Sequence, residues 1–183
     1  MKKNENEEPF DLKKELLSYV FMLVGVVITV LVLNEFFIVN ARIPSASMEN
    51  TIMTGEQIFG NRLAYAFGMP DRFDIIIFRY PDDETDLYIK RVIGMPGETV
   101  EIRDGKVYID GSETPLDDSF CAETPTGSYG PFYVPDGHFF VMGDNRNHSN
   151  DSRFWVNKYV STDQILGKAF FRYWPVTRMG KLE

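Results

Sequence analysis

The chain has 183 residues, enough for one domain of ordinary size with an appendage and too few for two large domains. Its 44% hydrophobic and 25% charged residues exclude a disordered tail, and its net charge of −8 argues against a nucleic-acid binder, because no basic excess neutralises phosphates. One cysteine, Cys121, and two histidines, His138 and His148, exclude an internal disulfide and metal sites built from several thiolates or three histidines.

The first expected element is a membrane anchor over residues 16–38. Leu16 to Leu33 reads LLSYVFMLVGVVITVLVL without a charge, and at about 1.5 Å per residue it gives roughly 27 Å of helix, close to the hydrocarbon thickness of a bilayer. A buried core helix rarely is apolar on every side, and the apolar region of a cleavable signal peptide is shorter, at about 7–15 residues. We therefore predict an anchor that is not cleaved.

The orientation of the anchor follows from the positive charges near its ends. The lysines before the span are Lys2, Lys3, Lys13 and Lys14. Only Arg42 follows the span closely, and the orientation rule counts Lys and Arg. We therefore expect a single-pass protein of the cytoplasmic membrane, with residues 1–15 as a cytoplasmic tail and residues 39–183 on the extracytoplasmic side.

From Gln57 onward the apolar residues follow a period of two, which is typical of strands. Phe73–Phe78 is a short apolar run, suited to a strand that is buried on both faces. Thr99–Arg103 and Lys106–Ile109 alternate between apolar and polar residues on either side of Asp104-Gly105. This pattern predicts a tight hairpin in which both turn residues have positive φ.

Two further strands are expected over residues 138–142 and 169–174. Residues 113–131 are rich in Ser, Thr, Pro, Gly and acids, which favours a surface excursion. No convincing amphipathic helix follows the anchor. The predicted fold is therefore mostly β, with an N-terminal transmembrane helix followed by an extracytoplasmic domain of folded sheets or a barrel-like form.

Lys90 is the first candidate for chemistry. On a strand it shares one face with Tyr88 and Val92, and apolar neighbours that remove water lower the pKa of a lysine. An ordinary pKa of about 10.4 leaves about one lysine in 2,500 neutral at pH 7, whereas a pKa of roughly 8 leaves about one in ten. A neutral amine can take a proton from a serine hydroxyl. The alternative is a lysine at a sheet edge with its ammonium in water.

Pro44-Ser45-Ala46-Ser47 supplies a candidate serine in a segment with turn character. A free serine hydroxyl is a weak nucleophile and needs a base such as Lys90. Ser47 could attack a carbonyl while Ser45 and a backbone N–H stabilise the oxyanion. The alternative is an ordinary loop with two serines.

The third cluster, Gly143–Arg153, places two acids and two arginines among polar turn formers after an apolar strand. Asp151 and Arg153 could brace Ser149, and Ser149 could orient Lys90. The alternative is a solvated turn with local ion pairs, which contribute little at a surface.

Jointly, these segments resemble bacterial signal peptidase I, a membrane-bound protease with a Ser/Lys dyad. The segment from Ser45 to Ile52 follows the family pattern around its nucleophile, and residues 90–97, Lys-Arg-Val-Ile-Gly-Met-Pro-Gly, match its lysine segment in full. Gly143–Arg153 matches the last box without exception, and residues 74–78 fit the remaining strand box. The resemblance runs from the anchor to about Trp174.

The resemblance implies that Ser47 is the nucleophile and Lys90 the general base, with the Ser45 hydroxyl and the Ser47 N–H in the oxyanion hole. The implied supporting residues are Ser149, Asp151 and Arg153, and the implied pocket residues are Ile43 and Ile89. It implies an endopeptidase that cuts signal peptides from exported preproteins after small residues at the first and third positions before the cut. Membrane lipid is the other expected partner, and no metal or organic cofactor and no nucleic acid is expected.

Two departures from the family pattern lie beside the candidate serine: Ala46 replaces glycine and Asn50 replaces proline. Three other functions stay open. The first is a hydrolase that uses His148 with Asp151, although no serine lies in a Gly-X-Ser-X-Gly elbow. The second is a membrane-anchored binding module, and the third is a self-cleaving Ser/Lys domain like those of stress-response repressors.

Overall fold

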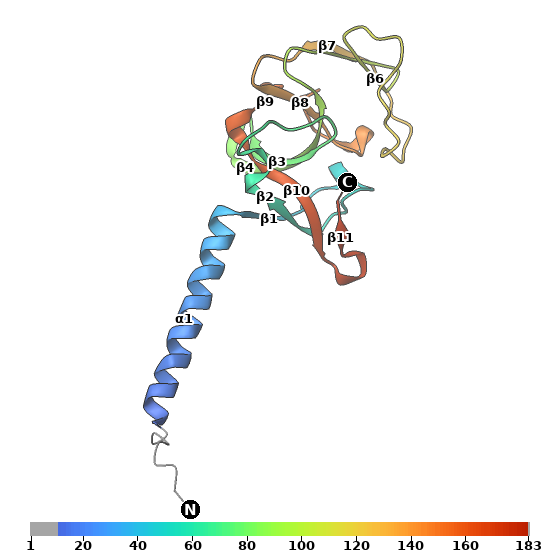
Figure 1. Cartoon of the computed structure of the whole chain (residues 1–183). Helices are drawn as coiled ribbons and strands as arrows, with labels where there is room; N and C mark the ends of the chain where they lie inside the picture. Colours follow the sequence, from blue (N-terminus) through green and yellow to red (C-terminus); the bar gives the residue numbers. More distant parts are fainter. Residues whose placement is uncertain (1–10, 183) are drawn as a thin grey trace, which may run out of the picture. The chain divides into compact units, whose positions relative to one another are not determined.

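The computed structural model describes residues 11–182, and the chain divides after Phe36 into two compact units (Figure 1). The first unit contains α1 (Leu12–Phe36), a helix of 25 residues without a buried side chain. At 1.5 Å per residue it is about 37 Å long, enough to cross a hydrocarbon core of about 30 Å. Among the described residues it is the one helix that is long and apolar enough to span a membrane.

The predicted bounds of the anchor differ from those of the helix. α1 begins at Leu12 rather than at residue 16, and it ends at Phe36 because Ile38 is already the first residue of a strand. The second unit begins at Phe37, whose carbonyl accepts from the Arg62 N–H at 3.0 Å. Of the predicted tail, residues 1–10 lie outside the described residues.

The second unit is built on an eight-stranded antiparallel sheet in the order β1-β2-β10-β3-β4-β8-β9, with β11 paired to β10. Its strands are β1 (Ile38–Arg42), β2 (Gln57–Asn61), β3 (Ile75–Tyr80), β4 (Asp83–Gly94), β8 (His138–Met142), β9 (Val160–Ser161), β10 (Ile165–Trp174) and β11 (Gly180–Lys181). The strand β10 begins four residues before the predicted range of 169–174. It lies between β2 and β3 in the sheet. The fold is mostly β, as predicted.

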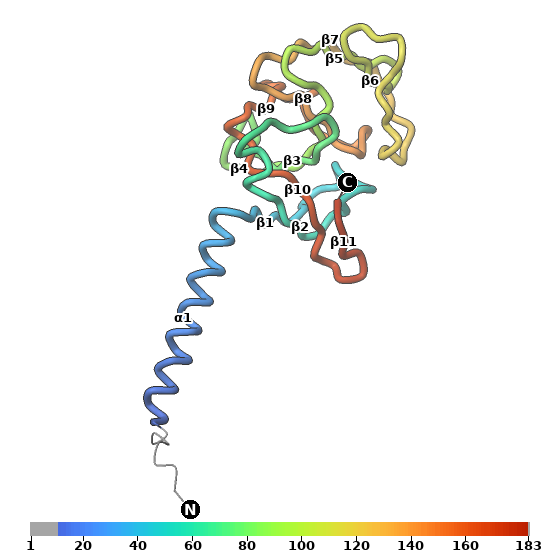
Figure 2. The backbone as a smooth tube through the Cα atoms, viewed as in Figure 1, coloured from blue at the N-terminus to red at the C-terminus, as the bar shows by residue number. Residues whose placement is uncertain are grey.

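A second sheet has three strands in the order β6-β5-β7, and Figure 2 shows them grouped at one end of this unit. Its strands are β5 (Thr99–Arg103), β6 (Lys106–Ile109) and β7 (Tyr129–Tyr133). Short 3-10 helices lie in connections between strands of the larger sheet. They are η1 (Ala46–Met48), η2 (Arg62–Tyr65), η3 (Arg146–His148), η4 (Thr162–Gln164) and η5 (Val176–Arg178).

The predicted hairpin between β5 and β6 is confirmed. Asp104 and Gly105 have φ values of 50° and 80°, so both turn residues are left-handed. A Cβ atom on Gly105 would lie 2.0 Å from the Pro125 carbonyl oxygen, so this position has no room for a side chain. The neighbouring excursion is only partly irregular, because its last residues enter β7 and pair with β5.

The strand β3 is buried on both faces, as its apolar run predicts. Ile75 and Ile77 pack in one hydrophobic cluster, whereas Ile76 and Phe78 pack in another. The first cluster also contains Met48 and residues of β1, β2 and β4, so it lies beneath the turn that carries Ser47.

Candidate active site

Ser47 lies in η1, the short turn that follows β1. The apolar side chains of Met48 and Ile52 are fully buried on either side of this turn, and the Ile52 N–H donates to the Met48 carbonyl at 2.8 Å. The turn is therefore held by the core beneath it, while the Ser47 side chain remains at the wall of a groove.

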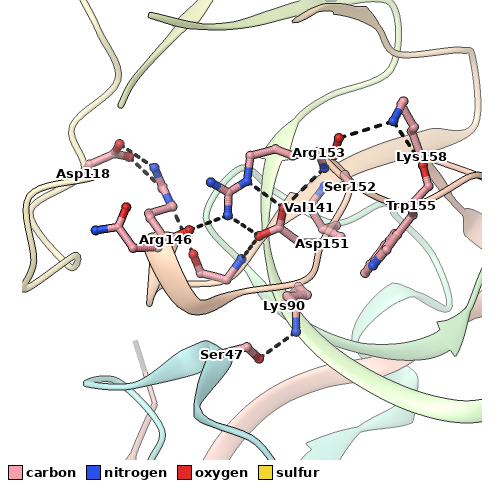
Figure 3. Close-up of polar contacts among 12 residues, drawn as sticks. Ser47, Lys90, Asp118, Val141, Arg146, Asp151, Ser152, Arg153, Trp155 and Lys158 are labelled. Atoms are coloured by element: carbon pink, nitrogen blue, oxygen red, sulfur yellow. Dashed lines mark hydrogen bonds and ion pairs between the residues drawn. The ribbon is translucent and has the colours of Figure 1, made fainter. Parts of the chain in front are cut away.

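Lys90 approaches Ser47 from β4, and Figure 3 shows their polar atoms pointing toward each other. Its Nζ donates to Ser47 Oγ at 2.8 Å and to the Ile89 carbonyl at 3.1 Å. The lysine is 3% exposed. Burial lowers its pKa from 10.5 to about 8, against the opposing charges of Asp151 and Asp144. The sheet-edge alternative, with the ammonium in water, is wrong.

An aromatic cluster contributes to this dry environment. Tyr88 stacks on Tyr80 with ring centroids 4.4 Å apart and meets Trp155 edge-on at 5.9 Å. Lys90 Nζ lies 5.4 Å from the centroid of the Tyr88 ring. The aromatic neighbour predicted from the strand pattern, Tyr88, thus lies close to the amine.

A groove of about 570 Å³ runs along the contact between Ser47 and Lys90. Its walls come from β1, from the turn after β1 and from β4. Ile43 and Ile89, the predicted pocket residues, both line it and are both buried in the cluster beneath. Ser45 is exposed at its edge, with its Oγ 3.4 Å from Ser47 Oγ.

The acids and arginines of the loop from Gly143 to Arg153 are buried although the loop also has exposed residues, so the alternative of a solvated turn with surface ion pairs is wrong. Arg153 donates from Nε and Nη2 to the two oxygens of Asp151 at 2.8 and 2.9 Å, and Asp151 also accepts from the Gly143 N–H at 3.0 Å. Asn145 then ties this loop to the serine turn, because its N–H donates to the Ser47 carbonyl and its Nδ2 to the Ala46 carbonyl.

Ser149 does not make the hydrogen bond to Lys90 that the pattern implies. Its Oγ is buried without a hydrogen-bond partner among the described residues. It lies against Gly143, where an added Cβ would be 2.3 Å from both Ser149 Oγ and the Ser47 carbonyl oxygen. Gly143 therefore permits the close approach of these two serines.

The pairing of His148 with Asp151 is not formed. The side chain of His148 is 73% exposed, and its Nδ1 lies 3.2 Å from Asn145 Oδ1. Asp151 is instead occupied by Arg153 and Gly143. A histidine-dependent hydrolase is therefore not supported by this geometry. No group of three or more potential metal ligands gathers within residues 11–182.

Three polar contacts of the site have no local signal in the sequence. Arg91, next to Lys90, binds Asp144 through two hydrogen bonds of 2.9 and 2.7 Å, and Thr51 donates to the same carboxylate. Asp118, from the excursion, accepts two hydrogen bonds from the buried Arg146. Most of these residues belong to the matched motifs, but the sequence does not show which residue each of them binds.

Comparison with known proteins gives a consistent match. The family described as signal peptidase, peptidase S26, matches residues 15–174. A probable signal peptidase I-2 of Synechocystis is 36% identical over 178 residues, which cover 94% of this chain and 76% of the relative. Signal peptidase I of Leptolyngbya laminosa is 41% identical, covering 80% and 74%. Signal peptidase I S of Bacillus subtilis is 32% identical, covering 92% and 95%.

Proposed function

Because the chain belongs to the signal peptidase family, peptidase S26, and is a serine-type peptidase, we propose that it removes signal peptides from exported preproteins with a dyad of Ser47 and Lys90. One observation carries the assignment of the dyad: a buried lysine amine lies 2.8 Å from a serine hydroxyl at the wall of a groove. This distance is within the reach of direct proton transfer.

Lys90 is the general base of the proposed mechanism. With a pKa of about 8, about one molecule in ten has a neutral amine at pH 7. That amine takes the proton from Ser47 as Oγ forms a bond to the substrate carbonyl carbon. The resulting ammonium returns the proton to the leaving amine when the peptide bond breaks, which leaves an acyl ester on Ser47. Lys90 then deprotonates a water that hydrolyses the ester.

The Ser45 hydroxyl and the Ser47 N–H are the proposed oxyanion donors. Ser45 Oγ lies 3.4 Å from Ser47 Oγ, so it is close to the carbon that Ser47 would attack. Donors that are fixed before the reaction stabilise the negative charge that develops on the carbonyl oxygen. Asp151 and Arg153 are proposed to hold the loop of Ser149 through the ion pair between their side chains.

The substrate is proposed to bind as an extended strand along the groove. β8 pairs with β4 from Arg91 to Gly94, so the preceding residues of β4 pair with β3 on one edge, and their other edge is unpaired within residues 11–182. Strand addition at such an edge supplies main-chain hydrogen bonds. Ile43 and Ile89 would line shallow pockets for small side chains at the first and third positions before the cut.

The proposal also includes the location of the chain in the cell. The helix α1 would anchor the chain once in the cytoplasmic membrane, with residues 1–15 inside and residues 39–183 outside. Protease added to intact spheroplasts should digest the second unit, whereas an antibody against the N-terminal tail should need permeabilised cells. The reverse accessibility would overturn the orientation.

The deciding experiment incubates the detergent-solubilised full chain with a purified preprotein and maps the cut by mass spectrometry. The wild type should cut once after a small residue, and Ser47→Ala should abolish the cut while it leaves the melting temperature within a few degrees. His148→Ala should retain most of the activity. Cleavage by Ser47→Ala would refute the dyad, and no cleavage by the wild type would favour a binding module.

A further inference from the structure

A chain of hydrogen bonds joins the turn of Ser47 to the strand of Lys90, and Thr51 stands at its centre. The half-buried Thr51 donates from Oγ1 to Asp144 Oδ2 at 2.5 Å. The same carboxylate, 1% exposed, accepts two hydrogen bonds from Arg91. Because Arg91 directly follows Lys90 on β4, the hydroxyl of Thr51 is linked through one carboxylate to the backbone that carries the amine.

The backbone of Thr51 is fixed from the opposite direction. Its carbonyl accepts from Arg172 Nη1 of β10 at 3.0 Å. Arg172 is itself held by an ion pair of 3.2 Å with the buried Glu56, which also accepts from the Met53 N–H. The segment after Ser47 is thus held on one side by β10 and on the other by Asp144.

The residue after Asp144 completes the connection. Asn145 donates to the carbonyls of Ala46 and Ser47, and the Ile52 N–H closes the turn onto Met48. A shift of residues 143–145 would therefore move the backbone of Ser47. The hydrogen bond from the Thr51 hydroxyl to Asp144 is a side-chain contact between the serine turn and this loop.

We propose that Thr51 is a positioning residue of the peptidase, whose hydroxyl fixes the serine turn relative to the strand of the general base. The proposal rests on the Ser47–Lys90 dyad proposed above. A dyad transfers a proton only when its two atoms stay within about 2.6–3.2 Å, and a misplacement of about 1 Å can cost about a hundredfold in rate. Loss of the Thr51 hydroxyl should therefore slow the chemical step and leave the groove that binds substrate intact.

The chain offers a matched set of variants for this test. Thr51→Val keeps the shape of the side chain and removes its donor, whereas Thr51→Ser keeps the donor and removes a methyl group. Thr54→Val is the control, because Thr54 lies in the same segment and donates at 3.0 Å to Glu49 on the exposed surface. All three are made in the full chain, purified in detergent and compared by thermal melting.

The readout is the separation of kcat from KM on one preprotein, measured across pH. Thr51→Val should lower kcat about tenfold to a hundredfold with KM changed less than about twofold. It should also raise the apparent pKa of the essential base, because a looser site admits water to the amine. Thr51→Ser should restore kcat to within about threefold, and Thr54→Val should match the wild type.

Failure of the positioning role can be distinguished from failure of the proposed dyad. If Ser47→Ala is inactive but Thr51→Val has the kcat and pH profile of the wild type, the positioning role is refuted and the dyad stands. If Thr51→Val lowers only the melting temperature, its role is structural and the inference is wrong. If Ser47→Ala retains cleavage, the dyad and the inference fall together.

Discussion

Two neighbouring cations of β4 are buried to the same extent and are stabilised in different ways. Lys90 is 3% exposed and Arg91 is 2% exposed. Arg91 forms a two-pronged ion pair with Asp144 and donates to the Phe73 carbonyl at 2.8 Å. Lys90 contacts a hydroxyl and a carbonyl, and it forms no ion pair with any residue from 11 to 182.

This difference distinguishes a charge that stabilises the fold from a charge whose group can lose its proton. A buried guanidinium that is paired with a carboxylate keeps its proton and fixes two segments to each other. A buried amine without a carboxylate partner loses its proton more easily, because burial disfavours its charged form. The strand thus combines a fixed charge with an amine whose pKa lies near the pH at which the enzyme would work.

The largest expected effect comes from removal of the reactive charge. Lys90→Met should lower kcat on the order of 10⁴-fold or more, because the proposed general base is lost. It should also raise the free energy of unfolding at pH 7 by about 1–3 kcal/mol, since a desolvated charge is removed. Denaturant unfolding of the full chain in detergent checks the gain. Lys90→Arg is the control, which keeps the charge and should be equally inactive without becoming more stable.

The same group gives the wild type a pH-dependent stability. The pKa of Lys90 is about 8 in the folded state and 10.5 without burial, so the unfolded chain binds more protons between these values. The contribution of Lys90 to stability should therefore rise as the pH rises from 8 to 10.5. The advantage of Lys90→Met should shrink over this window, and a constant advantage would contradict the lowered pKa.

Removal of the ion pair between Arg91 and Asp144 should lower the free energy of unfolding. Asp144→Asn leaves the guanidinium of Arg91 buried opposite a neutral group and should lower the free energy of unfolding by about 3–5 kcal/mol. Glu101→Gln provides the control, because its ion pair with Arg103 is exposed and spans 3.7 Å. That change should stay within about 0.5 kcal/mol. Equal losses in the two variants would show that burial of the ion pair does not matter.

A smaller effect is expected from the pH of the assay. With a base of pKa about 8, kcat/KM should rise about fiftyfold from pH 6 to pH 8 and level off above pH 9. Initial cleavage rates of a preprotein whose own fold is unaffected over this range supply the profile. A profile that is flat from pH 6 to pH 8 would mean that the essential base is not a desolvated lysine.

The smallest effect concerns Cys121, a half-buried thiol. Burial raises its pKa to about 11, and the nearby charge of Arg146 lowers it only in part. Iodoacetamide at pH 7 should therefore react with Cys121 about a hundredfold more slowly than with a free thiol, because the thiolate is the reactive form. Cys121→Ser should leave cleavage unchanged, whereas a marked loss would give the thiol a role in the site.

The sequence predicts best what neighbouring residues determine. The Asp104-Gly105 turn and the strand from Ile75 to Phe78 follow from local residue types, since positive φ and an unbroken apolar run each allow few structures. The neighbours of Lys90 on its strand left open whether the amine is buried or lies in water at a sheet edge, and the structure shows that it is buried. The segment around Ser47 and the lysine segment, residues 90–97, each selected one of the two candidate dyad residues, which the structure places in contact.

The contacts that fix the site are less accessible to sequence reasoning, because they join distant segments. Thr51 and Asp144 are 93 residues apart, and Asp118 and Arg146 are 28 apart. No periodicity relates such pairs, and the insertion of β10 between β2 and β3 likewise depends on the complete sheet. The close packing of Ser149 against Gly143 is another feature that a motif does not describe.

The short contact between Lys90 and Ser47 also makes the site open to selective covalent inhibition. At pH 8 about half of the Lys90 amines would be neutral, whereas an ordinary lysine is less than about 1% neutral. An aldehyde small enough to enter the groove would condense with Nζ to an imine, with loss of water, only 2.8 Å from the serine oxygen. A boronic acid group on the same compound would place its electrophilic boron beside that oxygen and engage both members of the dyad at once.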